Sequence, residues 1–254
     1  MSRRFEGRAC LVTGSTGIGA AAARALAQEG GSVFVVSRTA DHARGLADSI
    51  PGAGWHAADL AQEEGVESAV AECVGAFGKL DCVFNVAGIS GRRLGDGPVH
   101  ELTVEGWDTV MAVNVRSMFL VTRAAVRQML GQGGGAILNM SSVLAEHPSA
   151  PLFSTHAYAA SKGAINSFSL AVAAHYARDG IRVNVIAPGL VATPMSQRAQ
   201  SDPEVLAYLE RRQPLATGPI AADDVVGAVL YLLSDDARMV TGQVMAVDGG
   251  WGVA

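Results

Sequence analysis

The chain has 254 residues, of which 19 are basic and 24 acidic, and its net charge is −5 at pH 7. A mildly acidic chain is a poor candidate for nucleic-acid binding, because that function relies on Lys and Arg to neutralise phosphates. Hydrophobic residues make up 49% of the chain and charged residues 17%, which argues for one large core and against disorder.

The cysteines and the amino-terminal residues indicate a cytoplasmic protein. Cys10, Cys73 and Cys82 lie in apolar stretches, and their odd number argues against a disulfide framework. Arg3 and Arg4 are not followed by the apolar region of a signal peptide, and no apolar run approaches the ~18 residues of a membrane span. The His and Cys residues show no metal-ligand spacing, so we expect neither a metal site nor a membrane partner.

Short β-rich apolar runs alternate with helical patterns along the whole chain. Strands are expected at residues 8–13, 32–37, 54–58, 80–86, 135–140, 181–187 and 243–247. Helices are expected at residues 18–28, 41–49, 62–77, 103–130, 157–178 and 223–233, with Gly106 as a candidate break in the fourth. Two segments, 88–101 and 188–219, show no strong pattern.

This alternation predicts an α/β fold, with a doubly wound parallel sheet and helices on both faces. No linker or repeat divides the chain, so residues 1–254 are expected to form a single domain. Ligands of such sheets bind beyond the carboxyl ends of the strands. Both unpatterned segments begin where a strand ends, so we expect both to border the site.

A glycine-rich turn joins the first strand to the first helix. Its residues are Gly14-Ser15-Thr16-Gly17-Ile18-Gly19. Glycines let a backbone approach a pyrophosphate closely, and the following helix offers free N–H groups and the positive end of its dipole. An ordinary glycine-rich turn would look similar, but the strand before it and the helix after it favour a dinucleotide site.

The end of the second strand predicts which dinucleotide is bound. An acidic residue there would bind the 2′-hydroxyl of NAD, but this chain has Ser37 and Arg38. The guanidinium of Arg38 suits a 2′-phosphate, and Ser37 brings no repelling charge. We therefore predict NADP(H) as the preferred cofactor and NAD(H) as a possible one, against the alternative that Arg38 is an ordinary surface residue.

Tyr158 and Lys162 are four residues apart near the start of a predicted helix, so their side chains share one face. A phenol normally titrates near ~10, and a neighbouring ammonium favours the phenolate. A tyrosine tuned in this way is a general acid and base for a carbonyl or an alcohol. A surface Tyr–Lys pair would have the same spacing.

Several motifs occur in one order along the chain: the glycine-rich turn, Asn85-Val86-Ala87-Gly88, Ser141-Ser142, the Tyr158/Lys162 pair and Pro188-Gly189. From about Gly7 to Gly250, the chain resembles the short-chain dehydrogenase/reductase family. The resemblance implies a Rossmann-type sheet of seven strands, a nicotinamide cofactor, and a homotetramer or homodimer.

The resemblance also implies roles for individual residues. Tyr158 would be the acid and base, and Lys162 would bind the nicotinamide ribose and lower the pKa of Tyr158. Ser142 would hydrogen-bond the substrate oxygen, and Asn114 resembles the asparagine that holds a proton-relay water. Without the resemblance, Ser142 would be interpreted as a capping hydroxyl and Asn114 as a buried amide satisfied by backbone.

Further cofactor contacts follow from the resemblance. Asp59 and Leu60, after the third strand, correspond to the adenine-binding position. The floor of the cofactor site would be formed by Asn85, Ala87 and Gly88, and the carboxamide would be held by Pro188, Gly189, Val191 and Thr193. The substrate would be bound by the segment at about 189–219.

Two features depart from the family pattern. Only Ser15 and Thr16 separate Gly14 from Gly17, where three residues are usual, so either the turn is tighter or the register shifts. Tyr158 follows Ser142 by 16 residues, about three more than is common, and the extra length falls within 146–156. His147 and His156 in this stretch are candidates for substrate contact or for ordinary solvated side chains.

We therefore predict an NADP(H)-dependent oxidoreductase that acts on a ketone or a secondary alcohol. A catalytically inactive NAD(P)-binding regulator, an NAD-dependent dehydrogenase, and an epimerase or dehydratase with tightly held NAD are the alternatives. An apolar pocket wall is indicated by Leu144, Phe153, Leu190 and Met195, although a loop packed on the core would have the same composition.

Overall fold

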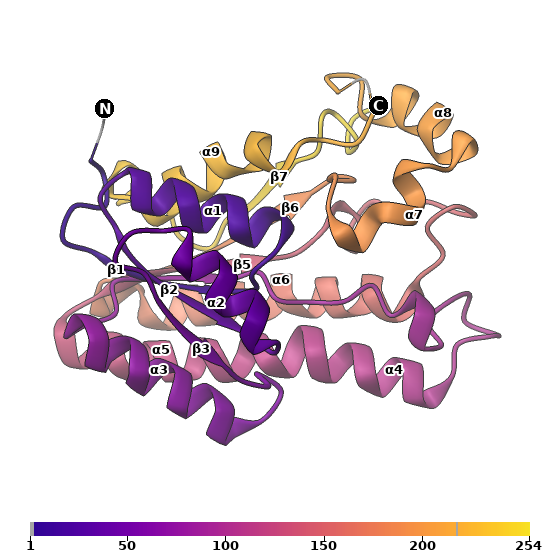
Figure 1. The fold of residues 1–254 in the computed structure, drawn as a ribbon. Helices are drawn as coiled ribbons and strands as arrows, with labels where there is room; N and C mark the ends of the chain where they lie inside the picture. Colours follow the sequence, from indigo (N-terminus) through magenta and orange to yellow (C-terminus); the bar gives the residue numbers. More distant parts are fainter. Residues whose placement is uncertain (1–2, 217) are drawn as a thin grey trace.

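The computed structural model describes residues 3–216 and 218–254. Its centre is a seven-stranded parallel sheet with the strand order β3-β2-β1-β4-β5-β6-β7 (Figure 1). The strands are β1 (Ala9–Thr13), β2 (Ser32–Ser37), β3 (Gly54–Ala57), β4 (Cys82–Asn85), β5 (Gly135–Met140), β6 (Ile181–Pro188) and β7 (Val244–Val247). All seven predicted strands are confirmed, as is the doubly wound α/β fold.

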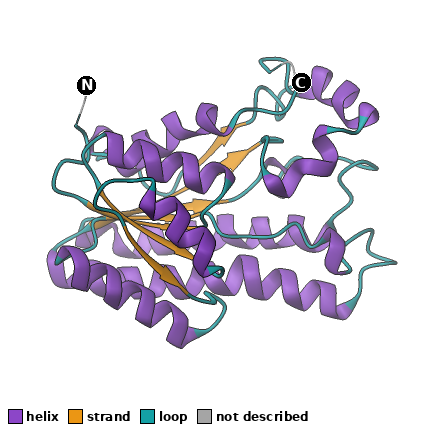
Figure 2. Ribbon diagram, in the orientation of Figure 1, coloured by secondary structure: helices purple, strands orange, loops and turns teal. Residues whose placement is uncertain are grey.

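Helices cover both faces of the sheet (Figure 2). They are α1 (Gly17–Gln28), α2 (Ala40–Asp48), α3 (Glu63–Phe77), α4 (Val104–Val110), α5 (Ser117–Gln132), α6 (His156–Tyr176), α7 (Gln197–Gln200), α8 (Pro203–Arg212) and α9 (Ala222–Leu233). Helices α1 and α9 lie side by side on one face, and α3, α5 and α6 lie on the other (Figure 1).

Successive residues of a strand pack alternately into two separate apolar cores, one on each face of the sheet. Val33 and Val35 of β2 pack toward α1 and α9, whereas Phe34 and Val36 pack toward α3 and α5. Successive side chains of a strand point to opposite faces, so a strand covered on both sides must be apolar at every position. This explains why the predicted strands are continuous apolar runs.

The long helical segment 104–132 is continuous through Gly106, so the expected break there is wrong. A Cβ atom at residue 106 would lie 2.6 Å from the backbone carbon of Gly95, which means that Gly106 permits a close approach. The irregularity lies further on, where Met111–Arg116 form a π-helical stretch between α4 and α5. Helical segments of this kind occur frequently at functional sites.

By length and composition alone, Val104–Gln132 is apolar enough to cross a membrane. Half of its most apolar window is buried inside the protein. Its α5 part packs on α3 and on the sheet. These contacts are those of a core helix.

Within the predicted segment 188–219, the described residues 188–216 are more ordered than their weak sequence pattern predicts, because they contain α7 and α8. Asp202 caps α8, its Oδ1 accepting hydrogen bonds from the N–H groups of Glu204 and Val205, and Pro203 occupies the first helical position. This Asp-Pro-Glu start is a recognisable helix signal. Val205 and Leu209 then bury the inner face of α8 against Trp251.

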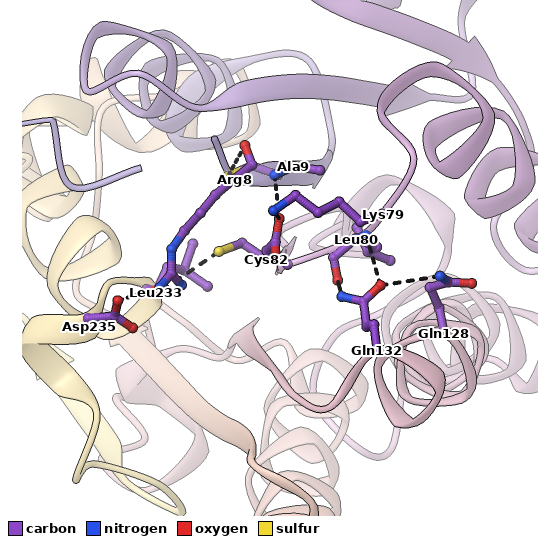
Figure 3. A network of polar contacts seen from close by, with 11 residues as sticks. Arg8, Ala9, Lys79, Leu80, Cys82, Gln128, Gln132, Leu233 and Asp235 are labelled. Atoms are coloured by element: carbon purple, nitrogen blue, oxygen red, sulfur yellow. Dashed lines mark hydrogen bonds and ion pairs between the residues drawn. The ribbon is translucent and has the colours of Figure 1, made fainter. Parts of the chain in front are cut away.

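A polar network ties the strands together at their amino ends, opposite the predicted site (Figure 3). Asp81 accepts hydrogen bonds from the N–H of Ala9 (2.7 Å) and pairs with Lys79 (3.1 Å). The amide of Gln132 donates to the carbonyl of Leu80 at 2.7 Å, which fixes the end of α5 against β4. Arg8 pairs with Asp235 in the same network. These contacts pair the polar groups that lie at or just before the starts of β1 and β4.

The first turn of α6 is capped by a carboxylate that is about sixty residues distant in sequence. Asp96 is 6% exposed, and its two oxygens accept hydrogen bonds from the N–H groups of Ala157 and Tyr158, each at 2.9 Å. The amino end of a helix leaves such N–H groups unpaired and carries a partial positive charge. Asp96 therefore fixes the helix that bears Tyr158.

We expect Asp96→Ala to lower the free energy of unfolding by about 2 to 3 kcal/mol, because it leaves two buried donors unpaired. Asp202→Ala removes the cap of the more exposed α8 and should cost only about 1 kcal/mol. Urea denaturation followed by circular dichroism measures both values. Equal losses would contradict the role assigned to Asp96.

Candidate active site

A cavity of about 290 Å³ lies at the carboxyl ends of the central strands. Residues from the glycine-rich turn, the segments after β4, β5 and β6, the start of α6 and the carboxyl-terminal Trp251 line it. The predicted site residues among them are Gly14, Thr16, Gly17, Ile18, Ala87, Gly88, Ser142, Tyr158, Lys162, Pro188, Gly189, Val191 and Thr193. The strand ends thus bring together most of the predicted site.

The glycine-rich turn forms a tight backbone cradle. Gly14 and Gly17 have positive φ angles of 95° and 52°, which favour glycine, and α1 begins at Gly17. A Cβ atom on Gly19 would lie 2.5 Å from the carbonyl oxygen of Gly14. Gly19 therefore lets α1 pack against the turn.

No side chain caps the amino end of α1, although Thr16 occupies the N-cap position. The first N–H groups of a helix have no partner within the helix. The cavity-lining turn therefore presents a glycine backbone and the positive end of a helix dipole. Both suit a pyrophosphate, so the residues present fit a dinucleotide.

Thr13, which sequence reasoning did not select, fixes this turn relative to the neighbouring strand. Its Oγ1 accepts hydrogen bonds from the N–H groups of Val86 (3.0 Å) and Ala87 (3.2 Å). The Val86–Ala87 segment then lies directly against Gly14. A buried Thr at the last position of β1, just before a glycine turn, is the signal that would have identified it.

Three of the four candidate catalytic side chains converge on the cavity, from the end of β5 and the start of α6. Ser142 follows the end of β5, and Tyr158 and Lys162 lie one turn apart at the start of α6. The Nζ of Lys162 donates to the carbonyl of Met140 at 2.8 Å and lies 5.4 Å from the centre of the Tyr158 ring. The same contact thus joins α6 to the end of β5.

Burial dominates the protonation of this cluster. It raises the pKa of Tyr158, while the neighbouring Ser142 hydroxyl acts in the opposite direction. The lowering of the Tyr158 pKa by Lys162 stays a prediction. Burial also lowers the pKa of Lys162 to about 8, because an ammonium loses hydration there. The phenol stays protonated at neutral pH.

Asn114 lies in the π-helical stretch, and its side chain is fully engaged. The Nδ2 group donates to the Ile89 carbonyl and to Ser161 Oγ, both at 3.0 Å, and Oδ1 accepts from the N–H of Ile89 at 2.8 Å. The amide therefore fixes the segment after β4 next to α6. This arrangement is that of a buried amide satisfied by backbone, which was the alternative interpretation of Asn114.

The remaining predicted cofactor residues lie outside the cavity lining. Ser37 is the last residue of β2, Arg38 follows it, and the Arg38 side chain is exposed. Asp59 is exposed after β3, where its Oδ1 accepts from the N–H of Ala61, and Leu60 is buried. Ser15 and Gly19 belong to the turn without lining the cavity. Asn85 is buried and donates to Thr122 and Asn139, which places it in the core.

One wall of the cavity is apolar. Leu144, Phe153, Leu190 and Met195 all line it, so the predicted pocket wall is confirmed. The longer segment before α6 packs on the carboxyl-terminal residues, where the ring centres of Phe153 and Trp251 are 5.4 Å apart. His147 and His156 do not line the cavity.

In residues 3–216 and 218–254, no group of three or more His, Cys, Asp or Glu side chains is arranged to hold a metal ion. Cys10, Cys73 and Cys82 are buried and free.

The buried amine of Lys162 has a consequence for stability. Its folded pKa of about 8 lies below the ordinary 10.5, so charging it destabilises the folded state at pH 7. Between pH 8 and 10.5 the folded state releases this proton first, and the penalty disappears as pH rises. We expect Lys162→Met to be more stable than the native chain by up to about 3 kcal/mol at pH 7. The difference in unfolding free energy between the two proteins should become smaller by pH 10.

Urea titrations of both proteins at pH 7, 8, 9 and 10 measure this difference. A stability difference that stays constant across the series would show that Lys162 is not a buried, weakened base.

Known proteins resemble this chain over its whole length. Residues 12–252 match the family model described as enoyl-(acyl carrier protein) reductase. The 2,5-dichloro-2,5-cyclohexadiene-1,4-diol dehydrogenase of Sphingobium indicum is 34% identical over 260 residues, covering 100% of this chain and 99% of that protein. The cis-4-hydroxycyclohexanecarboxylate dehydrogenase of Sinomonas cyclohexanicum is 36% identical over 256 residues and covers 99% of both chains.

A solved structure described as gox2181 superposes with a TM-score of 0.93 at 27% identity, covering 99% of this chain and 98% of that one. The fold, the ordered motifs and these full-length matches lead to one conclusion: the chain belongs to the short-chain dehydrogenase/reductase family and is an oxidoreductase acting on CH–OH groups.

Proposed function

We propose that this enzyme transfers a hydride between NADP(H) and a carbonyl or secondary alcohol of a small, largely apolar substrate. The observation that carries the proposal is the convergence of Ser142, Tyr158 and Lys162 on one cavity that also contains the glycine-rich turn. The relatives named above are dehydrogenases of ring alcohols, which supports the same chemistry.

The cofactor would lie along the carboxyl ends of the strands. The Gly14–Gly19 turn would hold its pyrophosphate, and Pro188, Gly189, Val191 and Thr193 would hold its carboxamide end. Two features support NADP(H) over NAD(H). Position 37 carries a serine and not an acidic residue, and the guanidinium of Arg38 is exposed. When bound, a nicotinamide supplies the hydride donor or acceptor.

The side chains of this protein would transfer the proton to and from the substrate oxygen. The Tyr158 hydroxyl donates a proton to a carbonyl oxygen during reduction, which suits a phenol that burial keeps protonated. Ser142 hydrogen-bonds the same oxygen and stabilises its developing charge. Lys162 orients the ribose of the cofactor and holds positive charge beside the phenol.

The segment 189–219, with α7 and α8, would enclose the substrate. Leu190 and Met195 contribute to the apolar wall from this segment, together with Leu144 and Phe153. An apolar wall of this kind suits a hydrocarbon ring or chain.

The enzyme would act in the cytoplasm as a homodimer or homotetramer. Trp107, Phe119 and Leu170 are 40%, 37% and 45% exposed on α4, α5 and α6, and all three helices contact the π-helical stretch Met111–Arg116. Large apolar side chains exposed on a surface can mark a subunit interface. The three free, buried cysteines agree with a reducing compartment.

Tyr158→Phe tests the proton transfer. We expect kcat for oxidation of a secondary alcohol to fall at least about 100-fold, because the proton has no donor or acceptor. The dissociation constant of the cofactor, measured by fluorescence titration, should stay within about threefold. Tyr176→Phe, at the other end of α6, is the matched control and should keep full activity. Retained activity in Tyr158→Phe would refute the role.

Arg38→Ala tests the cofactor preference. We expect the KM for NADP to rise about tenfold or more, because a charged hydrogen bond to the 2′-phosphate is lost, and the KM for NAD to change little. Arg24→Ala, an exposed arginine on α1, serves as the control. A native enzyme that prefers NAD would contradict the assignment.

A further inference from the structure

Two arginines line the cavity at positions that neither the glycine-rich turn nor the candidate catalytic residues explain. Arg92 lies in a short 3₁₀ turn after β4, and Arg198 lies in α7 after β6. They reach the same cavity from separate segments of the chain. Burial lowers the pKa of Arg92, the positive charge of Arg198 acts in the same direction, and Asp96 acts against both.

The charged side chains that line the cavity are all positive. Among the described residues that line it, Arg92, Arg198 and Lys162 are cationic, and none is Asp or Glu. Lys162 lies beside Tyr158, whereas the two arginines are carried by other elements. The cavity therefore combines a reacting end, an apolar wall and two guanidinium groups.

The existing contacts of the two arginines leave donors for a ligand. Arg92 donates through Nη2 to the carbonyl of Leu152 at 3.3 Å, which is an uncharged acceptor. Arg198 pairs through Nη1 with Asp202 at 3.1 Å, but Asp202 also caps α8. A guanidinium has five N–H donors in a planar fork, so each retains donors after these contacts.

We infer that Arg92 and Arg198 form a subsite for a carboxylate, and that the substrate is an alcohol or ketone whose reacting carbon is separated from this carboxylate by an apolar body. The inference rests on the proposed function, because it assigns the other end of the same substrate. A planar guanidinium fork matches the two oxygens of a carboxylate. Both arginines are exposed to solvent, so a carboxylate can reach them from the open side of the cavity.

The test compares matched substrates that differ by the carboxylate. We would measure kcat/KM for cis-4-hydroxycyclohexanecarboxylate against cyclohexanol, and for 3-hydroxybutyrate against 2-butanol, with NADP and with NAD. The carboxylate member of at least one pair should be preferred about tenfold or more. A preference for the neutral member in every active pair would overturn the subsite while leaving the proposed function in place.

Single substitutions then test whether Arg92 and Arg198 cause the preference for the carboxylate substrate. In Arg198→Gln and Arg92→Gln the ratio of carboxylate to neutral kcat/KM should fall about tenfold, mainly through KM. Arg198→Lys should restore part of it, because the charge returns without the planar fork. Arg93→Gln, an exposed neighbour of Arg92 outside the cavity lining, should keep the native ratio.

Three results separate the explanations. An equal loss for both members of a pair in the Gln variants would mean that these arginines only support the loops, and would overturn the inference. A rise in the KM of the cofactor, with an unchanged substrate ratio, would assign them to the cofactor and would also overturn it. If no alcohol or ketone of the panel is turned over with either cofactor, the proposed function itself fails.

Discussion

The hydrogen bond from Lys162 to the carbonyl of Met140 connects the two elements on which the site is built. It is 2.8 Å long and joins the second turn of α6 to the last residue of β5. An amine that is buried this deeply loses hydration, so it must be paired to persist. Because Ser142 lies two residues beyond Met140 and Tyr158 lies one turn before Lys162, the contact sets the relative position of all three candidate catalytic side chains.

Asp96 fixes the amino end of the same helix. Its carboxylate binds the N–H of Tyr158 itself, while the amide of Asn114 joins Ile89 to Ser161. The segment after β4 is therefore connected to the start of α6 at two places, directly through Asp96 and through Asn114 between Ile89 and Ser161. The site is rigid at its reacting end, because each of these polar groups is buried and engaged, whereas its outer wall is made of loop residues and short helices.

Sequence patterns identified the sheet correctly because every strand had to be apolar on both faces. They identified the glycine-rich turn and the Tyr158/Lys162 pair because these are local motifs. They failed where long-range contacts decide the outcome: Asp96 acts on backbone donors about sixty residues away, and Arg92 and Arg198 meet only after folding. The spacing of Tyr158 and Lys162 also does not reveal burial, which raises the pKa of Tyr158. The start of α8 was missed although Asp202-Pro203 signals it.

Trp251, only 1% exposed, packs on Phe153 and Tyr208 and also lines the cavity. Its indole donates to the carbonyl of His147 at 3.3 Å, so it connects the segment before α6 to the end of the chain. Trp251 is therefore part of the wall that encloses the substrate. A substitution at this position can change which substrates fit, without disturbing the sheet or the glycine-rich turn.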